Sequence, residues 1–311
     1  LNDDCTTLTI KMPQAEVPAY GVYVLECYAG NAYCGFSKSP MEPEVYDVST
    51  DMPIPGQKVV IYGKYLTNLT AVNLCGEIDI DINTVETTEA MDKLTFTMPE
   101  QLPTAESNGI LTVTTLGGRA TLPFYRYDWI YEDFDGNGTT IDWGWGTNNF
   151  GGNPAWGWPA LPASCPITMK SGNFAYFEAY TSWWDHNFLW NAKATPEGID
   201  PKTPLSKIEL RYEVYLHELP TTATTMTSTI TVFKQEKAGI PIVDRATGET
   251  MPGQWMSVAV PLTEFAPSAA TYADICALNV GDGDFKIYLG YDNAGDFVII
   301  AYDNFRLYVK E

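Results

Sequence analysis

The chain repeats part of its own sequence at a spacing of 86 to 88 residues. LTIKMP at residues 8–13 returns as LTFTMP at 94–99, and GVYVLECYAGNAYCGF at 21–36 matches GILTVTTLGGRATLPF at 109–124 without a gap. Self-similarity at a fixed spacing indicates a module that is used more than once. We therefore expect a complete module over about residues 40–126. Residues 1–39 would be the last part of a preceding copy, so that the chain begins inside a module.

The repeated segments have the pattern of short strands. Each 16-residue match reads as a strand, a tight glycine turn at 30–31 or 117–118, and a returning strand. KVVIYGKYL (58–66), AVNLCG (71–76) and LTFTMP add apolar or alternating runs of strand length, separated by Gly, Pro and Asn. This density of short strands predicts a small antiparallel β-sandwich.

The six cysteines show no CxxC and no zinc-ligand spacing. Cys27 and Cys34 lie symmetrically about Gly30-Asn31, so a two-residue hairpin centred there would place them opposite each other. They are then either two free thiols on neighbouring strands or a disulfide. The first is favoured, because the Cα separation of directly opposed hydrogen-bonded residues suits a disulfide poorly.

PGQKVVIYGKYLTNLTAVNLCG, followed by LTFTMP and GILTVTTLGGRAT, resembles the IPT/TIG class of immunoglobulin-like domain over most of residues 44–124. The resemblance implies a spacer or scaffold rather than a catalytic module.

Composition changes near residue 127, since all nine tryptophans lie at or after Trp129. After a linker-like segment, YRYDWIYEDFDG, long alternating strands follow, among them SKIELRYEVYLHEL (206–219) and FKIYLGYD (285–292). At most one short helix is expected, within 263–278. We therefore expect an all-β chain whose residues 127–311 form a larger jelly-roll β-sandwich.

The formal net charge of −21 opposes polyanionic partners, which makes nucleic acid, anionic lipid and sulfated or uronate-rich polymers poor candidates. A neutral ligand meets no such repulsion. No apolar run approaches the ~20 residues of a membrane span. The first residues, LNDDC, lack the pattern of a signal peptide, although an upstream targeting or anchoring segment could have been removed.

WMSVAVPLTEF (255–265) and AYDNFRLYV (301–309) are similar to jelly-roll carbohydrate-binding modules. The order of the domains over the whole chain resembles the cell-surface glycan-binding proteins of Bacteroidetes polysaccharide-utilisation systems. This resemblance implies binding of a neutral polysaccharide (a β-glucan or a hemicellulose such as xyloglucan), with the immunoglobulin-like domains as spacers. It also implies a lipid anchor on an upstream cysteine at the outer membrane and cooperation with a TonB-dependent transporter. Cys5 is a poor candidate for the lipid because it lies inside a module. We expect a monomer.

Two tryptophan clusters are the candidate binding residues, because sugar rings stack on aromatic faces while their hydroxyls need amide, carboxylate or imidazole partners. In DWGWGTNNFGGNPAWGWP (142–159), Trp143 and Trp145 would share one strand face, and so would Trp156 and Trp158. We favour the second pair as the platform. The other cluster holds Trp183, Trp184, Asp185, His186 and Asn187. Trp129 and Trp255, in alternating contexts, are expected in the core.

EDFDGNGTTID (132–142) begins like a calcium-binding EF-hand loop, but Gly144 stands where that loop needs Glu, and no helices flank it. On its residues alone, this segment reads as a turn with solvated acids. The jelly-roll resemblance implies instead a structural calcium ion held by Glu132 or Asp133 together with Asp303. No other cofactor is expected.

Two other functions were weighed against glycan binding. A glycoside hydrolase needs a defined pair of carboxylates, but no E-x-D-x-x-E strand motif, G-x-S-x-G or H-E-x-x-H is present, so no catalytic residue can be named. A protein-binding adhesin would surround its tryptophans with apolar and Arg residues. Here they are surrounded by Gly, Asn and Asp, which favours a hydroxyl-rich ligand.

Overall fold

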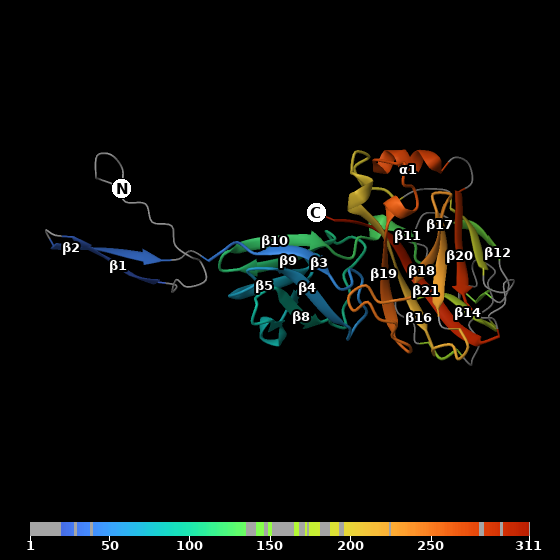
Figure 1. The fold of residues 1–311 in the computed structure, drawn as a ribbon, viewed down its shortest axis with the longest axis horizontal. Helices are drawn as coiled ribbons and strands as arrows, with labels where there is room; N and C mark the ends of the chain where they lie inside the picture. Colours follow the sequence, from blue (N-terminus) through green and yellow to red (C-terminus); the bar gives the residue numbers. More distant parts are fainter. Residues whose placement is uncertain are drawn as a thin grey trace.

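The protein is an elongated all-β chain, seen in a computed structural model (Figure 1). The structure describes residues 20–27, 30–37, 40–134, 141–145, 149–150, 165–167, 172, 174–180, 187–192, 196–223, 225–279, 283–292 and 295–310. Before residue 40, in 141–145, 149–150, 177–180 and 187–192, and at 283–284, only the backbone is described. No helix among these residues is both long enough and apolar enough to cross a membrane.

The first described strands form an antiparallel hairpin, β1 (Tyr20–Cys27) with β2 (Gly30–Ser37). A matching hairpin joins β9 (Ile110–Thr115) to β10 (Gly118–Pro123), so the strands end and restart at the predicted offset of 88 residues. Both returning strands begin earlier than predicted, at Gly30 and at Gly118. The expectation that Cys27 faces Cys34 is therefore wrong: Cys27 pairs with Gly30, and Cys34 pairs with Tyr23.

The next part is the small sandwich predicted for the complete module. Its sheets have the strand orders β3-β4-β8-β7 and β10-β9-β5-β6. The elements not yet given are β3 (Glu44–Val48), β4 (Lys58–Lys64), β5 (Leu69–Leu74), β6 (Ile78–Ile80), η2 (Ile82–Thr84), β7 (Glu86–Thr87) and β8 (Lys93–Thr97). Alternation builds the core: Val59 and Ile61 of β4 are fully buried, as is Leu94 of β8.

The larger sandwich has two facing sheets. The first, sheet I, has the order β13-β14-β21-β16-β19, with β11 also paired to β21; the second, sheet II, has the order β12-β15-β20-β17-β18. Their strands are β11 (Ile130–Glu132), β12 (Ile141–Trp145), β13 (Asn149–Phe150), β14 (Ala175–Tyr180), β15 (Asn187–Ala192), β16 (Ile208–Leu216), β17 (Met226–Val232), β18 (Gln235–Pro241), β19 (Trp255–Pro261), β20 (Gly283–Tyr291) and β21 (Phe297–Val309).

Short helical segments connect these strands: η3 (Tyr127–Trp129), η5 (Leu205–Lys207), η6 (Leu262–Glu264) and α1 (Tyr272–Leu278). The predicted short helix is α1. Thr271 caps the N-terminus of α1. Its hydroxyl accepts a hydrogen bond from the backbone N–H of Asp274, and the Asp274 carboxylate accepts one from the backbone N–H of Thr271.

The segment at 125–134 is not the loose linker that its sequence indicates. Tyr125 and Ile130 pack in the core of the small sandwich, whereas Tyr131 and Phe134 pack in the core of the large one. The two sandwiches are therefore joined by a segment that both bury.

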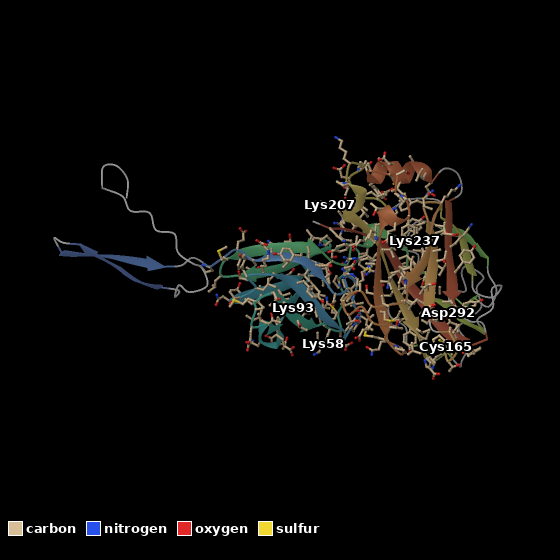
Figure 2. All side chains as sticks on the ribbon, viewed as in Figure 1. Lys58, Lys93, Cys165, Lys207, Lys237 and Asp292 are labelled. Carbon is tan, nitrogen blue, oxygen red and sulfur yellow. The ribbon has the colours of Figure 1, made fainter. Side chains whose placement is uncertain are left out.

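A second contact joins the sandwiches through charges. The predicted alternation along β16 is correct, but both of its faces are buried, including Glu209, Arg211 and Glu213. Arg211 donates hydrogen bonds of 3.1 Å to Asp47 and to Asp51, both in the small sandwich. The carbon of its guanidinium group also lies 3.3 Å from the centre of the Tyr308 ring. Side chains fill the region between the two sandwiches (Figure 2).

Candidate functional site

Sheet II presents one face to the core and the other to the outside. Along β20, Phe285, Ile287 and Leu289 are buried in the core cluster of the large sandwich. Lys286 and Tyr288 alternate with them and are half-buried on the outer face. We call this surface the outer face of sheet II.

Tyr288 lies on β20, the middle strand of this sheet. Its register partners are Asn187 on β15 and Thr229 on β17, and Thr227 follows two residues away on the same side. Thr227 and Thr229 are half-buried, whereas the neighbouring Ile230 is fully buried. The described part of the face thus combines an aromatic ring with hydroxyl groups, which suits a ligand that has both C–H surface and hydroxyls.

Two stretches predicted to bind belong to this same sheet. β12 carries Trp143 and Trp145, and β15 begins at Asn187. The strands are antiparallel neighbours, with Trp145 opposite Leu189 and Gly144 opposite Trp190. The fold therefore brings the first cluster and the end of the second one together, although they are more than forty residues apart in sequence. Their side chains lie outside the described residues.

The remaining predicted residues, Trp156, Trp158, Trp183, Trp184, Asp185 and His186, lie outside the described residues altogether. The strands that flank the second cluster are described. β14 of sheet I ends at Tyr180, which pairs with Phe297, and β15 of sheet II begins at Asn187, which pairs with Tyr288. The two strands that precede and follow residues 181–186 in the chain therefore belong to different sheets.

The end of the large sandwich beside Phe297 is held by a carboxylate. Asp296 accepts hydrogen bonds from the Thr221 and Thr222 hydroxyls and from the backbone N–H groups of Thr222 and Ala223, at 2.6 to 2.8 Å. The Thr221 hydrogen bond, with the others, holds the pKa of Asp296 well below its usual range. Asp292 accepts from the backbone N–H of Thr225 at 3.1 Å and lies at the end of β20 (Figure 2). The loop after β16 is therefore tied to the loop before β21.

Sequence reasoning missed two candidate residues. Tyr288 was passed over as part of a strand, although the alternation in FKIYLGYD separates it from Phe285 and Ile287 and places it with Lys286. Phe297 is 52% exposed at the start of β21, an unusual position for a phenylalanine. Only the pairing of β14 with β21, a long-range contact, reveals that Phe297 lies opposite Tyr180, the last residue of β14.

The core predictions for two tryptophans have different outcomes. Trp129 is 5% exposed and packs edge-to-face against Tyr308, which confirms its place in the core. Trp255 is only partly buried, and it lines a pocket between the sandwiches. Because Trp255 also packs against a small cluster of buried residues that includes Phe174 and Tyr215, its expected core position is correct in part.

The calcium candidates Glu132, Asp133 and Asp303 are all buried, with at most 3% exposure. The first and last strands of the large sandwich are neighbours, as expected, because Glu132 of β11 pairs with Phe305 of β21. Glu132 accepts from the backbone N–H of Phe134 at 2.6 Å, and Asp303 from that of Asn304 at 2.7 Å. In the part of the chain that the structure describes, no three His, Cys, Asp or Glu side chains gather so that they could hold a metal ion. Calcium stays a prediction.

Residues 125–309 match the family model described as surface glycan-binding protein B xyloglucan binding domain. A curated Bacteroides ovatus protein described as IPT/TIG domain-containing is 28% identical over 317 aligned residues, which cover all of this chain and 61% of that protein.

Two solved structures are similar over nearly the whole chain. One, a crystal structure with xylogluco-oligosaccharide, is 25% identical with a TM-score of 0.70, covering 95% of this chain and 64% of that one. Another, SGBP-B from a complex xyloglucan utilization locus in Bacteroides uniformis, is 23% identical with a TM-score of 0.67, covering 94% of this chain and 80% of that one, and shows the fold alone. The chain thus spans 61% and 64% of the length of its first relatives.

These similarities confirm the all-β fold with IPT/TIG-type immunoglobulin-like sandwiches, and the matching family model describes a glycan-binding domain, as expected for residues 127–311. Because the family model covers residues 125–309, more than half of its length, the chain belongs to the family of surface glycan-binding protein B xyloglucan-binding domains.

Proposed function

We propose that this chain binds a neutral polysaccharide, xyloglucan or a related β-glucan, on the outer face of sheet II and does not cleave it. The observation that carries the proposal is the position of Tyr288. This half-buried aromatic ring lies among hydroxyl side chains, opposite Asn187 on the neighbouring strand and in the same sheet as Trp143 and Trp145. Residues 127–311 would form the binding domain. Residues 40–126, and the module to which residues 1–39 belong, would act as spacers.

The chemistry of the site is stacking supported by hydrogen bonds. Trp156 and Trp158, with Trp183 and Trp184, would supply further flat surfaces for pyranose rings, while Asp185, His186 and Asn187 would take the hydroxyls. The net charge of −21 repels anionic polymers and leaves neutral ones unaffected. A few stacked rings with solvent-competed hydrogen bonds give dissociation constants between about 1 mM and 1 μM. Many repeats on one polymer raise the effective affinity.

Xyloglucan is favoured among neutral glycans by two supports: the description of the family model and the xylogluco-oligosaccharide in a solved relative. We further propose that the whole protein is a monomer, held at the outer membrane by a lipid outside this chain. It would pass its glycan to a TonB-dependent transporter. Family membership places such proteins at the cell surface.

The test is a panel of glycans measured by calorimetry and affinity electrophoresis. The panel contains four neutral glycans (xyloglucan, mixed-linkage β-glucan, glucomannan and xylan) and two anionic ones for comparison (pectin and heparin). Binding to at least one neutral glycan, strongly weakened when Trp156, Trp158, Trp183 and Trp184 are replaced by Ala, would support the proposal. Failure to bind every neutral glycan would overturn it, and reducing sugar released over hours would revive the hydrolase.

A further inference from the structure

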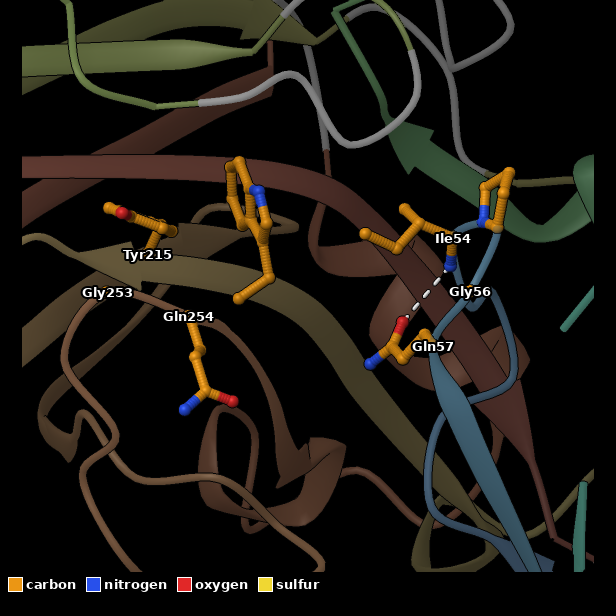
Figure 3. Close-up of a pocket in the computed structure, with 8 residues that line it drawn as sticks. Ile54, Gly56, Gln57, Tyr215, Gly253 and Gln254 are labelled. Atoms are coloured by element: carbon orange, nitrogen blue, oxygen red, sulfur yellow. Dashed lines mark hydrogen bonds between the residues drawn. The ribbon is translucent and has the colours of Figure 1, made fainter. Parts of the chain in front are cut away.

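A pocket of about 430 Å³ lies between the two sandwiches, in the size range of small-ligand sites. One wall is the turn at residues 54–57 of the small sandwich. The other comes from sheet I of the large sandwich, with Tyr215 at the end of β16 and residues 253–255 at the start of β19 (Figure 3).

Both walls are built from anchored glycine turns. Gly56 donates its N–H to the Met98 carbonyl, and Gly253 donates to the Leu216 carbonyl, each at 2.8 Å. Each glycine has a φ of +77°, which favours glycine, and a Cβ at either would meet nothing within 4 Å. The turns are thus fixed in place while the space beside them stays open.

The lining suits a polar, uncharged ligand. Tyr215 and Trp255 are cross-strand partners with ring centroids 5.6 Å apart, and Phe174 packs edge-on against Trp255 at 5.7 Å. The pocket also holds the carboxamides of Gln57 and Gln254 (Figure 3). Among the described residues, no Asp, Glu, Lys, Arg or His lines the pocket, in a chain that carries 57 charged residues.

The Gln57 carboxamide is oriented before any ligand arrives. Its oxygen accepts the backbone N–H of Ile54 at 3.1 Å, which leaves its NH₂ group as the donor toward the opening (Figure 3). Gln254 is exposed on the facing wall. An aromatic floor with carboxamide donors and acceptors is the combination that recognises a pyranose ring.

This pocket is separate from the outer face of sheet II. The inward-facing residues of β16 are Tyr212, Val214 and Leu216, so Tyr215 points to the outer side of sheet I. The two surfaces therefore lie on opposite sides of the large sandwich.

We propose that the pocket is a second glycan-contact site, which takes one or two uncharged pyranose units through Trp255, Gln57 and Gln254. The proposal rests on the proposed function for the class of ligand. A second contact on the same polymer would raise its retention without any change at the first site.

The test uses the five glutamines of the chain, Gln14, Gln57, Gln101, Gln235 and Gln254. Labelling the 311-residue chain with ¹⁵N-glutamine gives one pair of side-chain NH₂ signals for each. The variants Gln57→Ala, Gln101→Ala and Gln254→Ala assign the relevant signals, and Gln101, exposed and outside the pocket, is the matched control. A xylogluco-oligosaccharide is titrated while tryptophan fluorescence is followed in parallel.

We expect the Gln57 and Gln254 signals to shift and saturate while the Gln101 signal stays. The same shifts should persist when Trp156, Trp158, Trp183 and Trp184 are all replaced by Ala. In that background, Gln254→Ala should weaken binding by about three- to tenfold, the effect of one lost hydrogen bond. Because Gln254 is exposed, this substitution should not impair folding.

The outcomes separate the two proposals. Fluorescence changes without movement of Gln57 and Gln254 would overturn the pocket and leave the proposed function intact. If the Gln57 and Gln254 signals still shift in the variant that lacks the four tryptophans, and the affinity is unchanged there, the pocket is supported. The same result would overturn the tryptophans as the binding platform. No change in either readout, with this oligosaccharide and with the glycan panel, would overturn both.

Discussion

The guanidinium of Arg306 binds both carboxylate oxygens of Asp51, because Nε and Nη2 each donate a hydrogen bond of 2.8 Å. The two residues are 255 positions apart in the sequence. The same guanidinium donates to Glu213 at 2.8 and 3.0 Å, and Asp51 also accepts from Arg211 at 3.1 Å. All four side chains are at most 3% exposed. A buried network of this kind is costly to break on one side, since the remaining charge stays without its partner.

We expect Asp51→Asn to lower the free energy of unfolding by about 3–5 kcal/mol, because it removes the buried carboxylate that Arg306 and Arg211 share. Tryptophan fluorescence during urea denaturation measures this, and since every tryptophan lies at or after Trp129 it reports on the large sandwich. Glu86→Gln, an exposed acid on the small sandwich, should change stability by less than about 0.5 kcal/mol. Equal effects of both variants would contradict the role of the network.

The contribution of Asp51 should depend on pH. Burial raises the pKa of the Asp51 carboxyl, but the charges of Arg306 and Arg211 lower it by more, so that its pKa lies well below the usual range. A depressed folded pKa means that the stabilisation is complete above the unfolded pKa of about 3.9 and is lost as the pH falls below it. The stability difference between the natural chain and Asp51→Asn should therefore be constant from about pH 7 to 5 and shrink below about pH 4. A difference unchanged at about pH 2.5 would refute this.

Tyr288→Ala should weaken binding of a neutral glycan by about tenfold, because one stacking surface of the outer face of sheet II is removed. Isothermal titration with the best-bound glycan of the panel measures the change. Tyr46→Ala is the control: Tyr46 is 48% exposed on the small sandwich. If the Tyr288 variant and the natural chain bind with equal affinity, the glycan site does not lie on this face.

Phe297→Ala should reduce glycan affinity by about threefold while leaving the thermal midpoint almost unchanged, because the ring is 52% exposed. The smaller effect follows from its position at the edge of the site, where β14 ends. Leu116→Ala, at an apolar residue that is 67% exposed on the β9–β10 turn, serves as the matched comparison. A large drop in thermal midpoint would instead indicate a packing role.

Glycan affinity should be nearly insensitive to ionic strength. A neutral ligand presents no charges for salt to screen, so the dissociation constant should change by less than about twofold between about 0.05 and 0.5 M NaCl. Surface plasmon resonance at several salt concentrations would show this. A steep loss of affinity with salt would indicate a charged ligand.

The sequence was informative where periodicity alone decides the structure. The spacing of the two hairpins, the alternation of β4 and β20 and the short α1 helix follow from local patterns. The turn positions did not, because Gly30 and Gly118 begin returning strands instead of forming the turns. That shift of one or two residues is enough to separate Cys27 from Cys34, since register changes every cross-strand pair.

Features that depend on distant contacts could not be predicted. The polar face of β16 reads as solvated until Asp47 and Asp51 of another sandwich are placed on it. The alternating pattern around Trp255 predicts a core position. In the fold, the turn at residues 54–57, about 200 residues earlier in the sequence, leaves a pocket beside its ring. For the candidate site, only strand pairing shows that Trp143, Trp145 and Asn187 lie in one sheet, and Tyr288 becomes a candidate only through its register partners.

The charge network between the sandwiches also bears on how such chains can evolve. Arg211, Arg306 and Glu213 form a surface that only a module with acids at the positions of Asp47 and Asp51 can cover. A foreign immunoglobulin-like domain spliced in before residue 125 would bury these charges without partners or leave them open to water. The last spacer and the large sandwich are therefore expected to be inherited and recombined together as one unit, whereas spacers further from this junction are free to vary in number.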